Sequence, residues 1–324
     1  MPASIGTTGL YASFTVLIIA LLAVDFFMLK KEGAHTVGTR EAAGWSLVWV
    51  TIALAFGALF WWYLDDIAGP EFARARALEY FTGYLIEKSL AADNVFVWIT
   101  LFQYFAVPAA LQKRVLLYGV LGAILMRAVL IYVGALLLAR FHWILYVFGL
   151  LLLVTGVKML LFAGHEPDLA RNPVLRWMRG HLRISEHYHG ERFFVVLEGL
   201  RHATPLLLVL VLIEVTDLIF AVDSIPAIFA VTTDPFIVFT SNIFAILGLR
   251  AMYFLLADMA QRFHLLKYGL AGILIFIGCK MLLLDVYKIP VGIALGVVGL
   301  ILVLSVVASL LISKAGRAPP AAKP

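Results

Sequence analysis

Long uninterrupted apolar runs are the feature that most limits what this 324-residue chain can fold into. A helix that crosses a bilayer needs about 20 consecutive, mostly apolar residues, because the hydrocarbon core is about 30 Å thick. Runs of this kind predict an all-α polytopic membrane protein with about nine transmembrane helices. The nine predicted spans are Tyr11–Leu29, Trp45–Leu64, Tyr80–Val107, Val115–Leu138, Trp143–Ala163, Ala203–Val231, Phe236–Ala257, Leu265–Leu284 and Pro290–Ile312.

The composition excludes the common soluble classes. Hydrophobic residues make up 63% of the chain, and only 14% of the residues are charged, against about 25% in an ordinary soluble domain. A soluble enzyme, a nucleic-acid-binding domain or a disordered protein could not hide this much apolar surface. A β-barrel would show short alternating segments instead of continuous runs. The expected partner is therefore the lipid bilayer, and the net charge of +5 is not a nucleic-acid signal.

The positions of the basic residues predict an orientation with the N-terminus outside and the C-terminus inside. No Lys or Arg precedes the first span, whereas Lys30 and Lys31 follow it, which is the reverse of a cleavable signal peptide. With nine spans, 16 Lys and Arg residues fall in segments predicted to lie inside and four in segments predicted to lie outside. Cytoplasmic loops carry such an excess of basic residues.

Two parts of the chain resemble one another. In Glu87–Asn94 and in Asp217–Ser224, a carboxylate precedes an Asp by six residues, and a small polar residue follows that Asp. Further matches are Arg127 with Arg250, Arg140–His142 with Arg262–His264, and Gly156–Leu160 with Gly278–Leu282. The repeat unit covers three spans, so two consecutive copies must cross the membrane in opposite directions. Inverted repeats are typical of secondary transporters.

This repeat divides the chain into five predicted parts. Two N-terminal transmembrane helices come first, followed by one repeat, a basic cytoplasmic loop, the inverted second repeat, and a last helix with a disordered tail. Their predicted limits are residues 1–77, 78–163, 164–202, 203–285 and 286–324, in that order.

Five carboxylates lie in the leading helices of the two repeats: Glu87, Asp93, Glu214, Asp217 and Asp223. A charge at the bilayer centre costs about 2.5–3.5 kcal/mol, so these groups are expected to face a bundle interior or a water-filled cavity. We expect the two helices to cross and to bring four or five carboxylates together. Pro226 predicts a kink or a break in the second helix, because proline removes a helical hydrogen bond.

Charge pairing is the competing interpretation. Arg127 and Arg250 lie within spans, and Asp25 near the inner end of the first span favours a structural pair. Because the acidic residues outnumber these basic residues, a cation site is favoured for the remaining carboxylates. The candidate metal ligands are Glu87, Asp93, Asn94, Glu214, Asp217 and Asp223.

The candidate ligands are all oxygen donors, with no Cys or His in either motif. Oxygen ligands suit Mg²⁺, Ca²⁺ and Mn²⁺, whereas copper and zinc prefer sulfur or imidazole. Such an acidic group favours a divalent cation over Na⁺ and disfavours an oxyanion. Asn242, which lies mid-span, is either a further neutral ligand or one partner of a helix–helix hydrogen bond. No organic cofactor is expected, and the choice between Mn²⁺ and Ca²⁺ is left open.

Three segments resemble the TerC family: Glu87–Phe96, Glu214–Ala227 and Ser241–Arg250. The resemblance extends over nearly the whole chain and is strongest to the Alx branch of that family, which is associated with manganese efflux. It implies a multi-pass exporter of Mn²⁺ in the bacterial inner (plasma) membrane, with the six candidate ligands forming the metal site. Tyr84 stands where the second motif has Glu214, so the two halves of the site are not equivalent.

The favoured function is therefore a secondary transporter that exports divalent cations by alternating access, with proton exchange as a possible coupling. An alternative is a scaffold that supplies metal to exported proteins or supports tellurite resistance without transport. Its candidate contact region is Glu186–His189, which is either a metal-sensing patch or part of a solvated basic loop. An intramembrane aspartyl protease is disfavoured, because the Gly-x-Gly-Asp element of those enzymes is absent. No enzymatic activity is expected.

Overall fold

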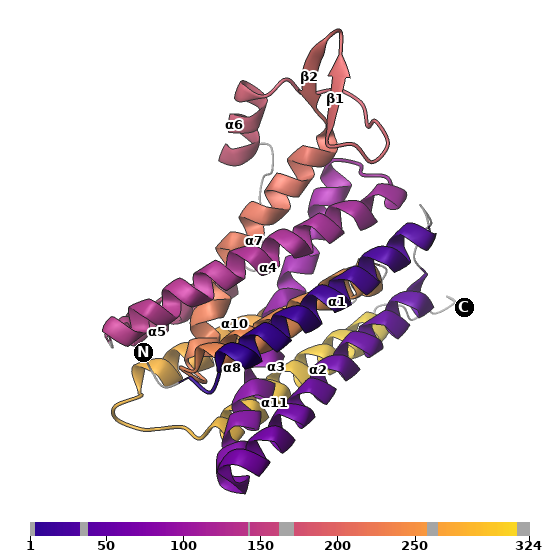
Figure 1. The fold of residues 1–324 in the computed structure, drawn as a ribbon. Coiled ribbons are helices and arrows are strands. Elements are labelled where there is room, and N and C mark those ends of the chain that lie inside the picture. Colours follow the sequence, from indigo (N-terminus) through magenta and orange to yellow (C-terminus); the bar gives the residue numbers. More distant parts are fainter. Residues whose placement is uncertain (1–3, 33–37, 142, 162–171, 258–264, 316–324) are drawn as a thin grey trace, which may run out of the picture.

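The computed structural model describes residues 4–32, 38–141, 143–161, 172–257 and 265–315. These residues form a bundle of helices with a small β-hairpin at one end (Figure 1). In chain order the elements are α1 (Thr8–Glu32), α2 (Thr39–Ala68), α3 (Pro70–Tyr104), α4 (Ala109–Arg140), α5 (Ile144–Leu161), α6 (Pro173–His181), β1 (Phe194–Leu197), β2 (Leu200–Ala203), α7 (Pro205–Phe229), α8 (Pro235–Leu247), α9 (Leu249–Ala257), α10 (Leu266–Leu282) and α11 (Val291–Ala315).

In the described part of the chain, seven helices are long and apolar enough to cross a membrane: α1, α2, α4, α5, α7, α8 together with α9, and α11. The prediction of a polytopic helical membrane protein is therefore confirmed. The other two predicted spans are also helical, but α10 has only 17 residues and α3 carries seven charged residues. For α3 and α10, membrane crossing stays a prediction.

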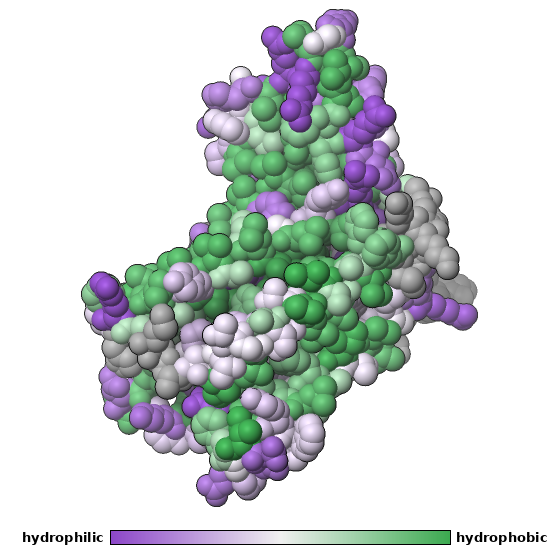
Figure 2. All heavy atoms as spheres, viewed as in Figure 1, coloured by the Kyte–Doolittle hydropathy of each residue, from purple (hydrophilic) through white to green (hydrophobic). Residues whose placement is uncertain are grey.

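The outer surface of the bundle is apolar. Leu300, Val303 and Leu304 on α11 are each more than half exposed, and large apolar side chains on α1, α2, α4 and α5 are exposed as well. Figure 2 shows hydrophobic side chains covering the helices, with hydrophilic ones around the hairpin end and at the left and lower edges of the bundle. A surface of this kind is suited to lipid, because water would make its exposure costly.

Helix α3 is the central element of the bundle. It packs against α2, α7, α8, α9 and α11, and most of its second half is buried, including Trp98. α3 runs antiparallel to α7, since Asn94 contacts Asp217 and Gly83 lies beside Ile228. The two helices that carry the acidic motifs are therefore direct neighbours that run in opposite directions.

Helices α5 and α10 form the most extensive helix pair in the fold. Glycines allow their backbones to touch: a Cβ at Gly278 would lie 2.8 Å from the carbonyl oxygen of Gly149. A Cβ at Gly156 would lie 2.9 Å from the carbonyl oxygen of Ala271. Small residues permit this close approach of helices in membrane proteins. The contacts also show that α5 and α10 run antiparallel.

The predicted break at Pro226 is wrong. Helix α7 continues through Pro226 and ends at Phe229, so the helix is not broken there, and the predicted kink stays a prediction. The break lies instead between α8 and α9, at Gly248. There the Lys88 ammonium group donates a hydrogen bond of 3.2 Å to the carbonyl oxygen of Ala245, a group that the interrupted helix leaves available.

The predicted basic loop, residues 164–202, contains a helix and a hairpin in its described part, residues 172–202. Asn172 caps α6, since its side-chain oxygen accepts from the backbone N–H groups of Val174 and Leu175. The hairpin turns at Glu198 and Gly199, both with positive φ, as a two-residue turn of the primed type requires. Residues 162–171, which include His165, lie outside the described residues.

Candidate metal-binding site

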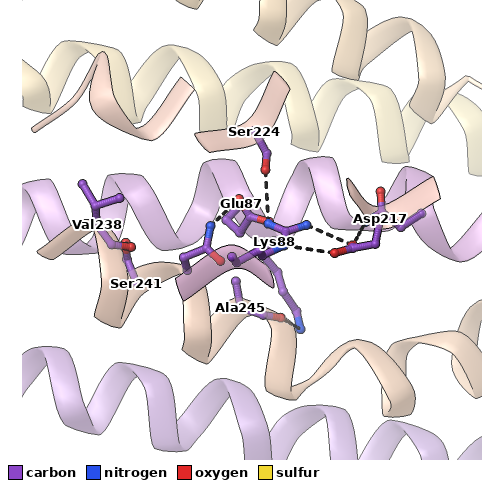
Figure 3. Close-up of polar contacts among 10 residues, drawn as sticks. Glu87, Lys88, Asp217, Ser224, Val238, Ser241 and Ala245 are labelled. Atoms are coloured by element: carbon purple, nitrogen blue, oxygen red, sulfur yellow. Dashed lines mark hydrogen bonds and ion pairs between the residues drawn. The ribbon is translucent and has the colours of Figure 1, made fainter. Parts of the chain in front are cut away.

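The buried guanidinium of Arg127 on α4 joins the two acidic helices. It forms ion pairs with Glu87 of α3 and with Asp217 of α7, and the Asp217 pair measures 3.1 Å. It also donates a hydrogen bond of 3.1 Å to the Ser224 hydroxyl. In Figure 3, Glu87 of α3 lies near Asp217 and Ser224, which both come from α7. Arg127 and Glu87 are each 0% exposed.

Two asparagines complete this buried network. Asn94 donates to Asp217 over 2.9 Å, and Asn242 donates to Glu87 over 3.0 Å. In each asparagine the side-chain oxygen is buried without a hydrogen-bond partner among the described residues. Buried polar atoms without a partner are rare and costly. These oxygens are therefore acceptors available to a cation or a water molecule.

A cavity of about 50 Å³ lies beside the Arg127 network. Its walls come from α3, α5, α7 and α10, with Arg127 from α4. This volume exceeds the roughly 10–15 Å³ that one water molecule requires, so a small ion with water fits. The polar groups on its walls are Glu87, Asp93, Asn94, Arg127, Thr155, Asp223 and Ser224.

Asp93 and Asp223 are the two cavity carboxylates that Arg127 does not hold. Asp223 accepts a hydrogen bond of 3.1 Å from the Thr155 hydroxyl of α5. Asp93 makes no hydrogen bond or close ion pair in the described part of the chain, and Lys267 of α10 interacts with it electrostatically. Both side chains are partly accessible. The cavity therefore offers two available carboxylates and the free oxygen of Asn94.

The expected gathering of four or five carboxylates is wrong for this conformation. Among the described residues, no three Asp, Glu, His or Cys side chains lie close enough to hold a metal ion together. Arg127 lies between Glu87 and Asp217, and Glu214 points toward α4 instead of the cavity. A Cβ at Gly122 would collide with the Glu214 carboxylate, so that glycine provides the space which Glu214 occupies.

Charge pairing accounts for part of the acidic set. Asp25 forms an ion pair with Arg250, which confirms its structural interpretation. Lys88 does not neutralise the neighbouring Glu87, because its side chain extends to Ala245 at the helix break. The structural and cation-binding interpretations therefore apply to different carboxylates.

Thr155 is a cavity residue that the sequence reasoning missed. The signal was present, because Thr155 is the only threonine in the predicted span Trp143–Ala163 and directly precedes the repeated Gly156–Leu160 segment. Its partner Asp223 lies 68 residues away, and no local pattern links the two.

The TerC family, described as a family of integral membrane proteins, matches residues 72–317. The chain belongs to the TerC family. Its match includes every residue on the cavity walls, whereas α1 and α2 lie outside it. The resemblance seen in the sequence is thereby confirmed. Among solved structures, none matches the chain.

Relatives of this TerC family protein extend over nearly the full chain. The "Putative membrane-bound redox modulator Alx" of Escherichia coli K12 is 59% identical over 302 residues, which cover 93% of this chain and 94% of the relative. The protein of the same name from Salmonella typhi is 58% identical over 304 residues, 94% of each chain. An uncharacterized membrane protein of Myxococcus xanthus, STKORF319, is 48% identical over 311 residues, 96% of this chain and 95% of the relative. The chain is thus an Alx-like member, and none of these names denotes an enzyme.

Proposed function

We propose that this protein is a secondary transporter of the bacterial inner membrane that exports divalent metal cations, Mn²⁺ foremost, by alternating access. The observation that carries the proposal is the cavity inside the helix bundle. It presents the carboxylates of Asp93 and Asp223 and the unpartnered oxygen of Asn94. Ionisable groups within a membrane bundle mark ion pathways, because their burial is costly.

The donor set of the cavity supports a hard divalent cation. Asp93, Asp223 and Asn94 provide oxygen atoms, and the hydroxyls of Thr155 and Ser224 lie on the same walls. Oxygen ligands of this kind suit Mn²⁺, Ca²⁺ and Mg²⁺. The preference for Mn²⁺ rests on the resemblance to the manganese-associated branch of the TerC family.

The directions of the helices support an inverted repeat. The two leading helices, α3 and α7, are antiparallel neighbours, as are the two third helices, α5 and α10. In contrast, α3 runs parallel to α8, with Gly83 beside Ser241 and Lys88 bonded to Ala245. The corresponding pair, α7 and α4, is parallel as well, with Gly119 beside Ile213 and Gly134 beside Phe229. Two three-helix units related by a two-fold axis in the membrane plane make contacts of this kind.

The contact between α5 and α10 supports the same relation in detail. When Lys158 is aligned with Lys280, Gly149 matches Ala271 and Gly156 matches Gly278. The structure pairs Gly149 with Gly278 and Gly156 with Ala271. Exchanging the two repeats therefore converts one close contact into the other. A helix contact that is preserved when the two repeats are exchanged is suited to the rocking of one repeat against the other.

The redox role in the name of the relatives does not favour thiol chemistry within this chain. Cys279 on α10 is the only cysteine, so an intrachain dithiol–disulfide couple is not available.

A metal-supplying scaffold is the second candidate function. The folded segment 172–204 favours it, because Trp177, Val196 and Leu200 are exposed there at 59%, 71% and 47%. Changing Val196 and Leu200 together to serine removes apolar contact surface outside the bundle. A transporter keeps its metal flux in this variant, whereas a scaffold loses delivery of metal to its partner.

The direct test of the proposal is ⁵⁴Mn²⁺ uptake into liposomes that contain the purified protein, with Ca²⁺ and Mg²⁺ as competitors. We expect Mn²⁺ uptake above that of protein-free liposomes, with weaker competition by the other ions. Ca²⁺ uptake without Mn²⁺ uptake would change the substrate and keep the mechanism. The absence of any divalent flux from a folded protein would refute transport.

A further inference from the structure

Arg127 has a place in the site that the exported metal does not explain. Among the described residues on the cavity walls it is the single basic one, beside the carboxylates of Glu87, Asp93 and Asp223. Its ion pairs reach Glu87 from the first acidic motif and Asp217 from the second. One cation therefore joins the leading helices of both repeats at the position where sequence reasoning placed a metal ion.

The pairing is not repeated in the other half of the molecule. Arg250 matches Arg127 in the sequence repeat, yet it forms its ion pair with Asp25 of α1. α1 lies outside the predicted repeats and outside the cavity walls. Arg127 thus joins the acidic network, whereas the ion pair of Arg250 with Asp25 lies elsewhere, so the repeat alone does not account for the place of Arg127.

An exporter that works by alternating access has to change between its inward-facing and outward-facing conformations both with metal bound and with the site empty. In the empty state the carboxylates lose their metal ion, and a buried charge without a partner is strongly unfavourable. A fixed cation within the site removes part of that cost. Arg is suited to this role, because its guanidinium stays protonated and binds two carboxylates at once.

We propose that Arg127 is a resident counter-cation that balances Glu87 and Asp217 when no metal is bound, and thereby allows the empty protein to change conformation. The inference rests on the proposed transport function and extends it. Arg127 is a positioning residue, because it acts through the two carboxylates. In the loaded state, a metal ion held by Asp93, Asp223 and Asn94 supplies positive charge in the cavity that Glu87 also lines. In the empty state Arg127 is the single basic group among the described cavity residues, so Arg127 is required for the empty return step.

Two modes of ⁵⁴Mn²⁺ transport separate the loaded step from the empty one. Net flux requires the empty return, whereas self-exchange, with Mn²⁺ on both sides of the membrane, proceeds through loaded states alone. For Arg127→Gln we expect net flux to fall by about tenfold or more, while self-exchange stays within about threefold of wild type. Arg127→Lys retains a cation and should recover part of the net flux.

Arg140→Gln is the matched control, since Arg140 is exposed in the last turn of the same helix. It should leave both modes unchanged. Equal net flux in Arg127→Gln and wild type would overturn the inference, and so would the loss of both modes in a folded Arg127→Gln protein that still binds Mn²⁺. If the wild type moves no metal in either mode, the proposed transport function fails first.

Discussion

Residues of one chemical type have different roles in this protein according to what their neighbours provide. Glu87 and Asp217 are fixed by the buried Arg127, whereas Asp93 and Asp223 face the cavity without that ion pair. Removing one partner of a buried ion pair costs about 3–5 kcal/mol. Substitutions at the two paired acids therefore affect folding as well as function, and the cavity pair is the cleaner place to test metal binding.

Glu214 tests, at the scale of one residue, the distinction between carboxylates that line the cavity and carboxylates that do not. It lies against Gly122 of α4 and does not line the cavity. We therefore expect Glu214→Gln to keep its Mn²⁺ affinity within about threefold of wild type, a difference below about 0.7 kcal/mol. Asp93→Asn should lose most of the affinity. Calorimetric titration of the purified protein with Mn²⁺ measures both, and equal losses in the two variants would show that Glu214 is a ligand.

At the scale of single elements, the sequence predicts where the helices lie better than where they are interrupted. Apolar runs locate helices because a segment within lipid has to satisfy its backbone hydrogen bonds internally, and a helix does so. Pro226 was a visible breaker, but it lies in the last turn of α7 and does not interrupt it. At the break at Gly248, Lys88 bonds to the carbonyl oxygen of Ala245, which lies 157 positions away in the sequence. A contact over that distance leaves no local pattern.

The α5–α10 contact gives a prediction at the scale of a helix pair. In Gly278→Ala, the new Cβ would lie 2.7 Å from the backbone nitrogen of Leu153, so the two helices have to separate. We expect a loss of about 1–3 kcal/mol of stability, as for other overpacked cores. Gly296→Ala on α11 is the control, since nothing lies within 4 Å of a Cβ there. Thermal unfolding in detergent should show a lower midpoint for Gly278→Ala alone, and matching midpoints would contradict the close packing.

At the scale of the whole molecule, the acidic motifs were found from the sequence, but their arrangement was not. Glu87 and Asn94 are seven residues apart on α3 and therefore share a helix face, and both join the Arg127 network. The distance between the motifs, however, depends on how α3, α4 and α7 rotate about their axes. Arg127 fixes that rotation by occupying the space between the carboxylates, and only the folded structure reveals this.

The orientation of the whole chain is a further prediction. Val196 on the hairpin is expected inside and Val286, between α10 and α11, outside; the two are 71% and 83% exposed. Each can be changed to cysteine after Cys279→Ala removes the native thiol. A membrane-impermeant maleimide should label Val286→Cys on intact spheroplasts, and Val196→Cys only after permeabilisation. The reverse labelling would place the N-terminus inside.

Metal flux through the acidic cavity is the central claim, and ⁵⁴Mn²⁺ uptake by Asp93→Asn and Asp223→Asn proteoliposomes tests it most directly. Asp66→Asn, at an exposed position of α2, is the matched control for loss of one carboxylate. The account predicts that uptake by both cavity variants falls by about tenfold or more, since each loses a charged ligand, while Asp66→Asn transports like wild type. Undiminished Mn²⁺ uptake in both cavity variants would contradict it.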